Sequence, residues 1–162
     1  MIPPLVPHAI ENVRDYPRPP TLERCEYPIK IVLGGVEIVN TQDAYRVLET
    51  FHPPTYYIPR SAFAESAVQP AAGQSLCEWK GQAAYFSLTA GGKTAARCAW
   101  AYAKPTPAFE AIAGHLALYV AAMDACYVDG ELAKPQPGGF YGGWVNSWIT
   151  GPIKGEPGTN HW

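Results

Sequence analysis

The stretch Ile29-Lys30-Ile31-Val32-Leu33-Gly34-Gly35-Val36-Glu37-Ile38-Val39 places two β-branched runs on either side of a glycine pair. Two glycines supply the positive φ angles that a tight turn between antiparallel strands requires. The pattern therefore predicts a β-hairpin. A second hairpin is predicted where Ala90-Gly91-Gly92-Lys93 separates residues 83–89 from residues 94–102.

The other segments extend this β pattern. Strands are predicted at residues 55–58 and from Ser75 onward, and Asp129-Gly130 is a turn signal. Thr41-Gln42-Asp43 is predicted to cap a short helix whose apolar residues are Ala44, Val47 and Leu48. A second short helix is predicted around residues 109–113. Residues 111–125 permit helix or strand, and strands after a short helix are favoured.

The predicted fold is mainly β, with antiparallel sheets in one domain, a few short helices and irregular Pro/Gly-rich termini. Residues 1–28 carry seven prolines and are predicted to form an extended arm packed on the body. Residues 29–134 are predicted to form the β domain. Residues 135–162 are rich in Gly and Pro but contain Trp144, Trp148 and Trp162, so they are predicted to form an ordered wrap of the same domain.

Composition and charge argue against several classes of function. The net charge is −2 and the basic residues are scattered, so no nucleic-acid partner is expected. No apolar run approaches the roughly 20 residues of a membrane span, and nothing resembles a signal peptide, which predicts a cytoplasmic protein. The four cysteines form no Cys-x-x-Cys pair, so buried free thiols are expected and no metal or cofactor is predicted. The apolar content is compatible with a homodimer.

Candidate site residues gather in and around Cys77-Glu78-Trp79-Lys80-Gly81. Lysine, arginine and aromatic rings on neighbouring strands can line a pocket for a small flat or anionic ligand. The candidate ligand-binding residues are Tyr57, Arg60, Cys77, Trp79, Lys80, Tyr85, Trp100 and Tyr102. The same aromatics are equally typical of core, and strand alternation predicts that Tyr56 and Tyr57 point to opposite faces.

Several longer motifs resemble the domain-of-unknown-function 427 family. They include Tyr16-Pro17-Arg18-Pro19-Pro20, the run Val47-Leu48-Glu49-Thr50 before His52-Pro53-Pro54, and Tyr56-Tyr57-Ile58-Pro59-Arg60. Cys77, Lys80-Gly81, Tyr85, Ala99-Trp100, Tyr102 and the ending Gly139-Phe140-Tyr141-Gly142-Gly143-Trp144 also match. The resemblance implies a small β-tent-like fold. Zinc-bearing relatives carry Cys-x-x-Cys pairs that are absent here. The nucleotidyltransferase-like label would need a paired acidic motif, and none is found.

Two main functions and one further alternative remain open from the sequence. The first is binding of a small anionic or partly planar ligand in the aromatic and cationic pocket. The second is a structural or protein-interaction domain without a ligand. The further alternative is an enzyme that uses Cys77 as nucleophile, since a nearby ammonium such as Lys80 lowers a thiol pKa. No base is assigned, so the catalytic residues are unknown.

Overall fold

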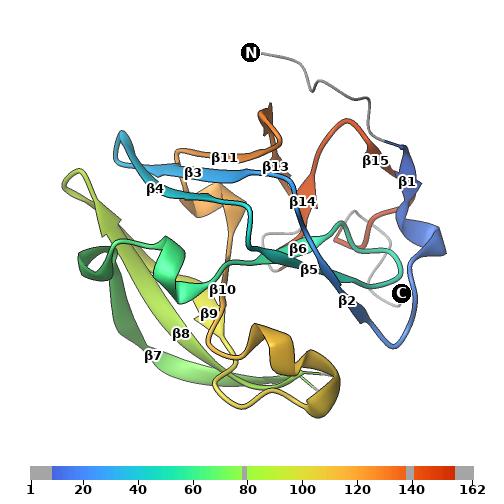
Figure 1. Cartoon of the computed structure of the whole chain (residues 1–162), viewed down its shortest axis with the longest axis horizontal. Helices are drawn as coiled ribbons and strands as arrows, with labels where there is room; N and C mark the ends of the chain where they lie inside the picture. Colours follow the sequence, from blue (N-terminus) through green and yellow to red (C-terminus); the bar gives the residue numbers. More distant parts are fainter. Residues whose placement is uncertain (1–8, 78–79, 138–140, 156–162) are drawn as a thin grey trace.

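Two four-stranded antiparallel sheets form the body of the computed structural model, which describes residues 9–77, 80–137 and 141–155 (Figure 1). The first sheet has the strand order β12-β11-β3-β4. Its strands are β3 (Ile29–Leu33), β4 (Val36–Thr41), β11 (Ala125–Val128) and β12 (Glu131–Leu132). The predicted hairpin at Gly34-Gly35 is the β3–β4 turn, and Asp129-Gly130 forms the β11–β12 turn with positive φ at both residues.

The second sheet has the order β10-β9-β8-β7 and contains the longest strands. Its strands are β7 (Val68–Cys77), β8 (Gly81–Ala90), β9 (Lys93–Ala101) and β10 (Leu116–Leu118). The predicted hairpin at Gly91-Gly92 joins β8 to β9. The chain is therefore mainly β with antiparallel sheets, as the sequence predicts.

A three-stranded sheet, β2-β5-β6, extends the second sheet. Its strands are β2 (Thr21–Arg24), β5 (Tyr45–Leu48) and β6 (Thr55–Tyr57). Just after β6, Ile58 and Leu116 exchange two backbone hydrogen bonds of 2.8 Å, which form an antiparallel bridge to β10. This bridge brings the aromatic end of β6 beside β9 and β10.

The helix predicted after Thr41-Gln42-Asp43 is wrong, because β5 is a strand. The Thr41 hydroxyl accepts a hydrogen bond from the backbone N–H of Asp43 (3.1 Å), which closes a local turn and begins no helix. Residues 45–48 then pair with β2 on one side and β6 on the other. Tertiary pairing thus overrides an apolar spacing that fits a helix.

The helical segments of the described chain are short 3₁₀ turns. They are η1 (Val13–Asp15), η2 (Arg60–Ala62), η3 (Glu65–Ala67), η4 (Pro107–Ile112) and η5 (Val120–Ala122). The short helix predicted near residues 109–113 corresponds to η4. The ambiguous segment that follows contains β10, η5 and β11, so strands with short turns replace a long helix.

Two apolar clusters divide the aromatic residues between them. The larger cluster lies between the two four-stranded sheets and contains Tyr56 and Trp144. The smaller one contains Tyr57, Tyr102 and Phe109, with Trp100 packed against it. Tyr56 and Tyr57 therefore belong to different faces of β6, as strand alternation predicts.

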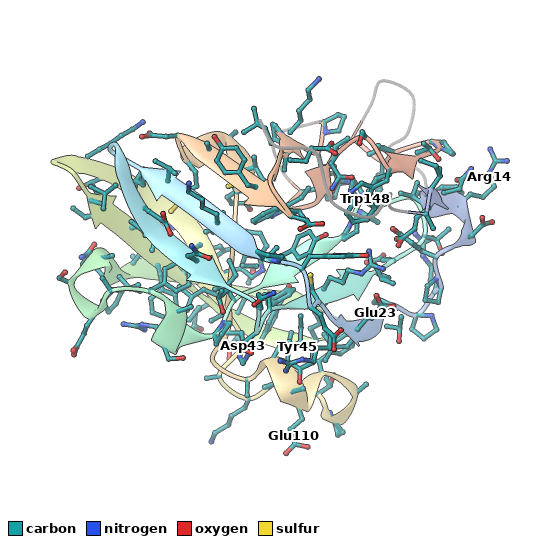
Figure 2. All side chains as sticks on the ribbon, turned by 45° about the horizontal axis from the view of Figure 1, so that its top comes forward. Arg14, Glu23, Asp43, Tyr45, Glu110 and Trp148 are labelled. Atoms are coloured by element: carbon teal, nitrogen blue, oxygen red, sulfur yellow. The ribbon has the colours of Figure 1, made fainter. Side chains whose placement is uncertain are left out.

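The segments near the two ends lie against the body and against each other. Strand β1 (Glu11–Asn12) pairs in parallel with β15 (Ile149–Thr150), and β13 (Lys134–Pro135) pairs with β14 (Trp144–Val145). Figure 2 shows Arg14 pointing outward beside β1, and Trp148 lying inward. Trp148 is buried, and Trp162 lies outside the described residues.

Cys25, Cys98 and Cys126 are free and buried, as the sequence predicts for them. Burial raises the pKa of the Cys126 thiol to about 12. A thiol in such surroundings stays protonated and unreactive at neutral pH. These three residues therefore act as small apolar core groups.

Candidate functional site: an aromatic pocket beside the smaller core cluster

A cavity of about 330 Å³ opens beside the smaller apolar cluster. It brings together five of the eight candidate residues predicted from the sequence, namely Tyr57, Lys80, Tyr85, Trp100 and Tyr102. Strand pairing explains this convergence, because Tyr85 of β8 and Trp100 of β9 are directly opposite each other in the register. Tyr102 follows two residues after Trp100, and the bridge after β6 brings Tyr57 alongside.

The aromatic rings support one another in this arrangement. The Trp100 indole N–H donates to the Tyr57 hydroxyl over 3.4 Å, and the Trp100 and Tyr119 rings have centroids 4.8 Å apart. Tyr57 and Tyr102 have centroids 6.3 Å apart. Such contacts fix ring orientation, so the pocket wall is largely formed before a ligand arrives.

Lys80 supplies positive charge to the pocket. Its ammonium lies 6.0 Å from the ring centroid of Tyr102 and 5.8 Å from that of Phe109. The backbone N–H of Thr106 donates to the Lys80 carbonyl over 3.0 Å, which ties this segment to the loop before η4. Within the described ranges Lys80 forms no ion pair, and it lines the cavity directly.

Two further cations lie against aromatic residues of the pocket, and sequence reasoning did not single them out. The Arg97 guanidinium stacks over Tyr85 at 4.5 Å, and the Lys154 ammonium lies 5.8 Å from the Tyr141 ring centroid. Arg97 is placed by a β-bulge between β8 and β9 and adopts a positive φ of 50°. At this bulge the Ser87 hydroxyl accepts a hydrogen bond from the Arg97 backbone N–H over 3.0 Å.

Arg60 does not join the pocket. Its guanidinium lies 5.8 Å from the ring centroid of Phe86, which packs against the larger cluster. Phe86 follows Tyr85 directly on β8, so the two rings point to opposite faces of the sheet. The expected convergence of Arg60 with Lys80 is therefore not found. Cys77 ends β7, but its side chain, like all of Trp79, lies outside the described residues.

The polar end of the pocket was missed as a site by sequence reasoning. It contains Glu49, His52 and Gln136, with Tyr141 and Gly142 beside them. The His52 Nε2 and Glu49 Oε2 atoms are 3.8 Å apart, and Gln136 Nε2 lies 3.0 Å from His52 Nδ1. Glu49 and His52 stand in one of the matched motifs, but 84 residues separate His52 from Gln136. Only the folded chain brings them together.

Gly142 lines the pocket and lies directly against the Trp100 indole. A Cβ atom at Gly142 would lie 2.8 Å from Trp100 Cζ2, so only glycine fits here without displacement. The backbone at residue 142 therefore packs directly on the Trp100 ring. This contact holds the segment after β13 against the β8–β9 face of the pocket.

A second hollow of about 610 Å³ lies on the first sheet. It is lined by Pro28, Lys30, Asn40, Tyr127, Gly130 and Leu132. Its cation is already engaged, because the Lys30 ammonium lies 3.9 Å from Glu37 and 5.7 Å from the Tyr127 ring centroid. The aromatic pocket is the better candidate, because more rings and polar groups converge there.

Across the described ranges, no group of three or more His, Cys, Asp or Glu side chains is placed to hold a metal ion. No helix in the same ranges has both the length and the apolar character needed to cross a membrane.

Comparison with known families gives one match. A family model described as "Domain of unknown function (DUF427)" matches residues 21–129. No curated protein matches the chain. The matched range contains the aromatic wall, Lys80, Glu49 and His52, whereas Gln136, Tyr141 and Gly142 follow it in the sequence.

Proposed function

Because the chain belongs to the DUF427 family, whose description names no activity, we propose a function from its pocket: binding of a small planar acid. The observation that carries this proposal is the convergence of Tyr57, Tyr85, Trp100 and Tyr102 with Lys80 on one cavity. Aromatic faces take a flat apolar body, and an ammonium takes a carboxylate or phosphate.

The size of the cavity supports a small ligand. Its volume of about 330 Å³ lies at the lower end of the range for small-molecule sites. That room suits a molecule of one or two fused rings with an acidic substituent. A peptide strand or a nucleic-acid helix would need a longer groove.

The charges around the cavity support an anion. Lys80, Arg97 and Lys154 each lie over an aromatic ring of the pocket wall. Glu49 contributes the opposing charge, and Arg18 lies 3.8 Å from its carboxylate. Among the described residues that line the cavity or lie over its rings, cations outnumber anions, which favours an acidic ligand.

The structural alternative has an observation in its favour. Tyr57 and Tyr102 are almost fully buried and belong to the smaller apolar cluster. These two rings would stabilise the fold with or without a ligand. Tyr85 and Trp100 remain half-exposed, and they are the rings that a ligand would contact. The alternative of a Cys77-dependent enzyme stays a prediction, since the Cys77 side chain is outside the described residues.

The experiment is a calorimetric titration with 2-naphthoate, a flat bicyclic carboxylate. We expect binding to the wild type and a roughly tenfold to hundredfold loss of affinity in Lys80→Met, the usual cost of one charge-assisted contact. Lys30→Met is the matched control, because Lys30 lies on the first sheet outside this pocket. Unchanged thermal unfolding of both variants shows that the fold is intact.

Two results contradict the proposal. One is the absence of any saturable binding of 2-naphthoate. The other is an equal affinity in the wild type, Lys80→Met and Lys30→Met, which would show that Lys80 does not hold the acid; the absence of binding would favour the structural alternative. A Trp100→Ala variant adds a second readout, because removal of the stacking face should weaken binding of this probe.

A further inference from the structure

Gln136 is almost fully buried beside the pocket, and its amide has only one orientation. Its Oε1 accepts a hydrogen bond from the Gly143 backbone N–H over 3.1 Å. Its Nε2 donates to the Lys154 carbonyl over 2.8 Å. A flipped amide would place oxygen against a carbonyl and nitrogen against an N–H, so both bonds would be lost.

This orientation determines the tautomer of His52. The Gln136 Nε2 atom, a donor, lies 3.0 Å from His52 Nδ1, which must therefore accept. The imidazole then carries its proton on Nε2. Burial lowers the pKa of His52, and the nearby charges of Lys154 and Arg18 lower it further, while Glu49 opposes them. His52 is thus neutral at pH 7 and offers Nε2–H as a donor.

A donor and an acceptor consequently lie side by side in the pocket. His52 Nε2 is 3.8 Å from Glu49 Oε2, which is too long for a direct hydrogen bond. Both side chains line the cavity and both are partly exposed. With Nδ1 engaged by Gln136, His52 has no free lone pair with which to act as a general base. The pair is suited to recognition of a ligand edge.

We propose that Glu49 and His52 recognise a lactam edge, which makes the ligand a planar lactam heterocycle with an acidic substituent. The ring carbonyl accepts from His52 Nε2–H, and the adjacent ring N–H donates to the Glu49 carboxylate. This inference rests on the proposed function, because it uses the same aromatic wall and Lys80. A site that forms hydrogen bonds to a polar ligand edge strongly rejects analogues without that edge, because its own polar groups are then left unpaired. An apolar pocket discriminates less strongly between ligands of different size.

The wall around this pair keeps the donor and acceptor in place. The His52 and Tyr141 rings meet edge to face with centroids 5.3 Å apart. Gln136 holds Gly143, and the neighbouring Gly142 packs on Trp100. Glu49 and His52 are thus connected to the Trp100 ring through Gln136, Gly143 and Gly142. Such preorganisation lowers the entropic cost of binding.

The test compares pterin-6-carboxylate, a bicyclic lactam acid, with 2-naphthoate, a bicyclic acid without a lactam. Isothermal titration calorimetry on the wild type should give an affinity at least tenfold higher for the pterin. In Glu49→Met, the pterin affinity should fall roughly tenfold to hundredfold, while that for 2-naphthoate should not fall, because the variant removes a carboxylate that opposes the bound acid. His52→Phe should act in the same direction. Glu65→Met, an exposed carboxylate outside the pocket, is the control.

The outcomes separate the two proposals. Equal affinity for both probes with a dependence on Lys80 overturns the lactam edge and leaves the planar-acid pocket standing. Binding of neither probe overturns both. An unchanged pterin preference in Glu49→Met also overturns the lactam edge. If His52→Phe unfolds because the Gln136 amide loses its partner, the Glu49→Met result decides.

Discussion

Gly34 and Gly91 lie back to back at the tips of two hairpins from different sheets. A Cβ atom at Gly91 would lie 2.7 Å from the carbonyl carbon of Gly34, and one at Gly34 would lie 2.9 Å from that of Ala90. Figure 1 shows the β3–β4 and β8–β9 tips together at the left of the molecule. Asp124 joins the same place, accepting from Gly35 N–H (2.8 Å) and from the Lys93 ammonium (3.0 Å).

Gly34→Ala should destabilise the protein more than Gly35→Ala. Both glycines have a positive φ (59° and 76°), so both substitutions carry the strain of a left-handed residue, about 1–2 kcal/mol. Only Gly34 meets another backbone, since nothing lies within 4 Å of a Cβ at Gly35. The extra overpacking cost should be about 1–3 kcal/mol. Urea unfolding of the two variants measures the difference, and equal losses would contradict the contact.

Arg46→Met should cost about 2–3 kcal/mol of folding stability. The half-buried guanidinium donates to both Glu11 oxygens (2.9 and 3.0 Å) and pairs with Glu23, which ties β1 and β2 to β5. Arg24→Met is the control, because its pair with Asp43 is exposed and should contribute less than about 1 kcal/mol. Chemical denaturation checks both, and similar losses in the two variants would show that the network has no special role.

His52 should make the folded protein sensitive to mild acid. The unfolded-state pKa of histidine is about 6.5, and burial lowers the folded-state pKa below that value. Between these two values the unfolded state binds more protons, so stability rises with pH and falls on acidification. Protonation at Nδ1 also breaks the bond from Gln136.

The measurement is the difference in unfolding free energy between the wild type and His52→Phe at pH 7.5 and at pH 5. The wild type should lose stability relative to the variant as the pH falls below 6.5, by at most about 1.4 kcal/mol per pH unit. A difference that is independent of pH would contradict the buried neutral imidazole.

Gly142→Ala should open the pocket wall. The new Cβ would collide with the Trp100 indole, so the segment after β13 must move away from the ring. The affinity for 2-naphthoate should fall, because the stacking surface is disturbed. Trp100→Phe frees space at the same contact, so the double variant should lose less stability than the sum of the two single variants. Strict additivity would show that Gly142 and Trp100 do not press on each other.

Much of the fold could be predicted because its signals are local. The glycine pairs at Gly34-Gly35 and Gly91-Gly92 define hairpins through backbone conformation alone, and strand alternation separates Tyr56 from Tyr57. The strand at residues 45–48 could not be recognised this way. Its apolar spacing fits a helix, and only pairing with β2 and β6 selects the strand.

The candidate site, too, could be predicted from the sequence only in part. Tyr85, Trp100 and Tyr102 fall on one face through the register of a single hairpin, so the sequence predicts them together. Arg60 was expected beside Lys80, but the neighbour of its guanidinium, Phe86, is on the opposite face of β8. A sequence shows the order of residues along a strand and leaves open which distant strand covers each face.

By itself, therefore, the sequence determined the hairpins, the mainly β class and the shared face of Tyr85, Trp100 and Tyr102, since each follows from turn chemistry or from the two-residue period of a strand. Only the tertiary structure decided that residues 45–48 form a strand, that Arg60 lies outside the aromatic pocket, and which residues form the polar end of that pocket. Gln136 reaches His52 across 84 residues of chain, and it does so because β13 pairs with β14 and Gly142 fits against Trp100. Such contacts depend on the packing of distant segments, which no local pattern encodes.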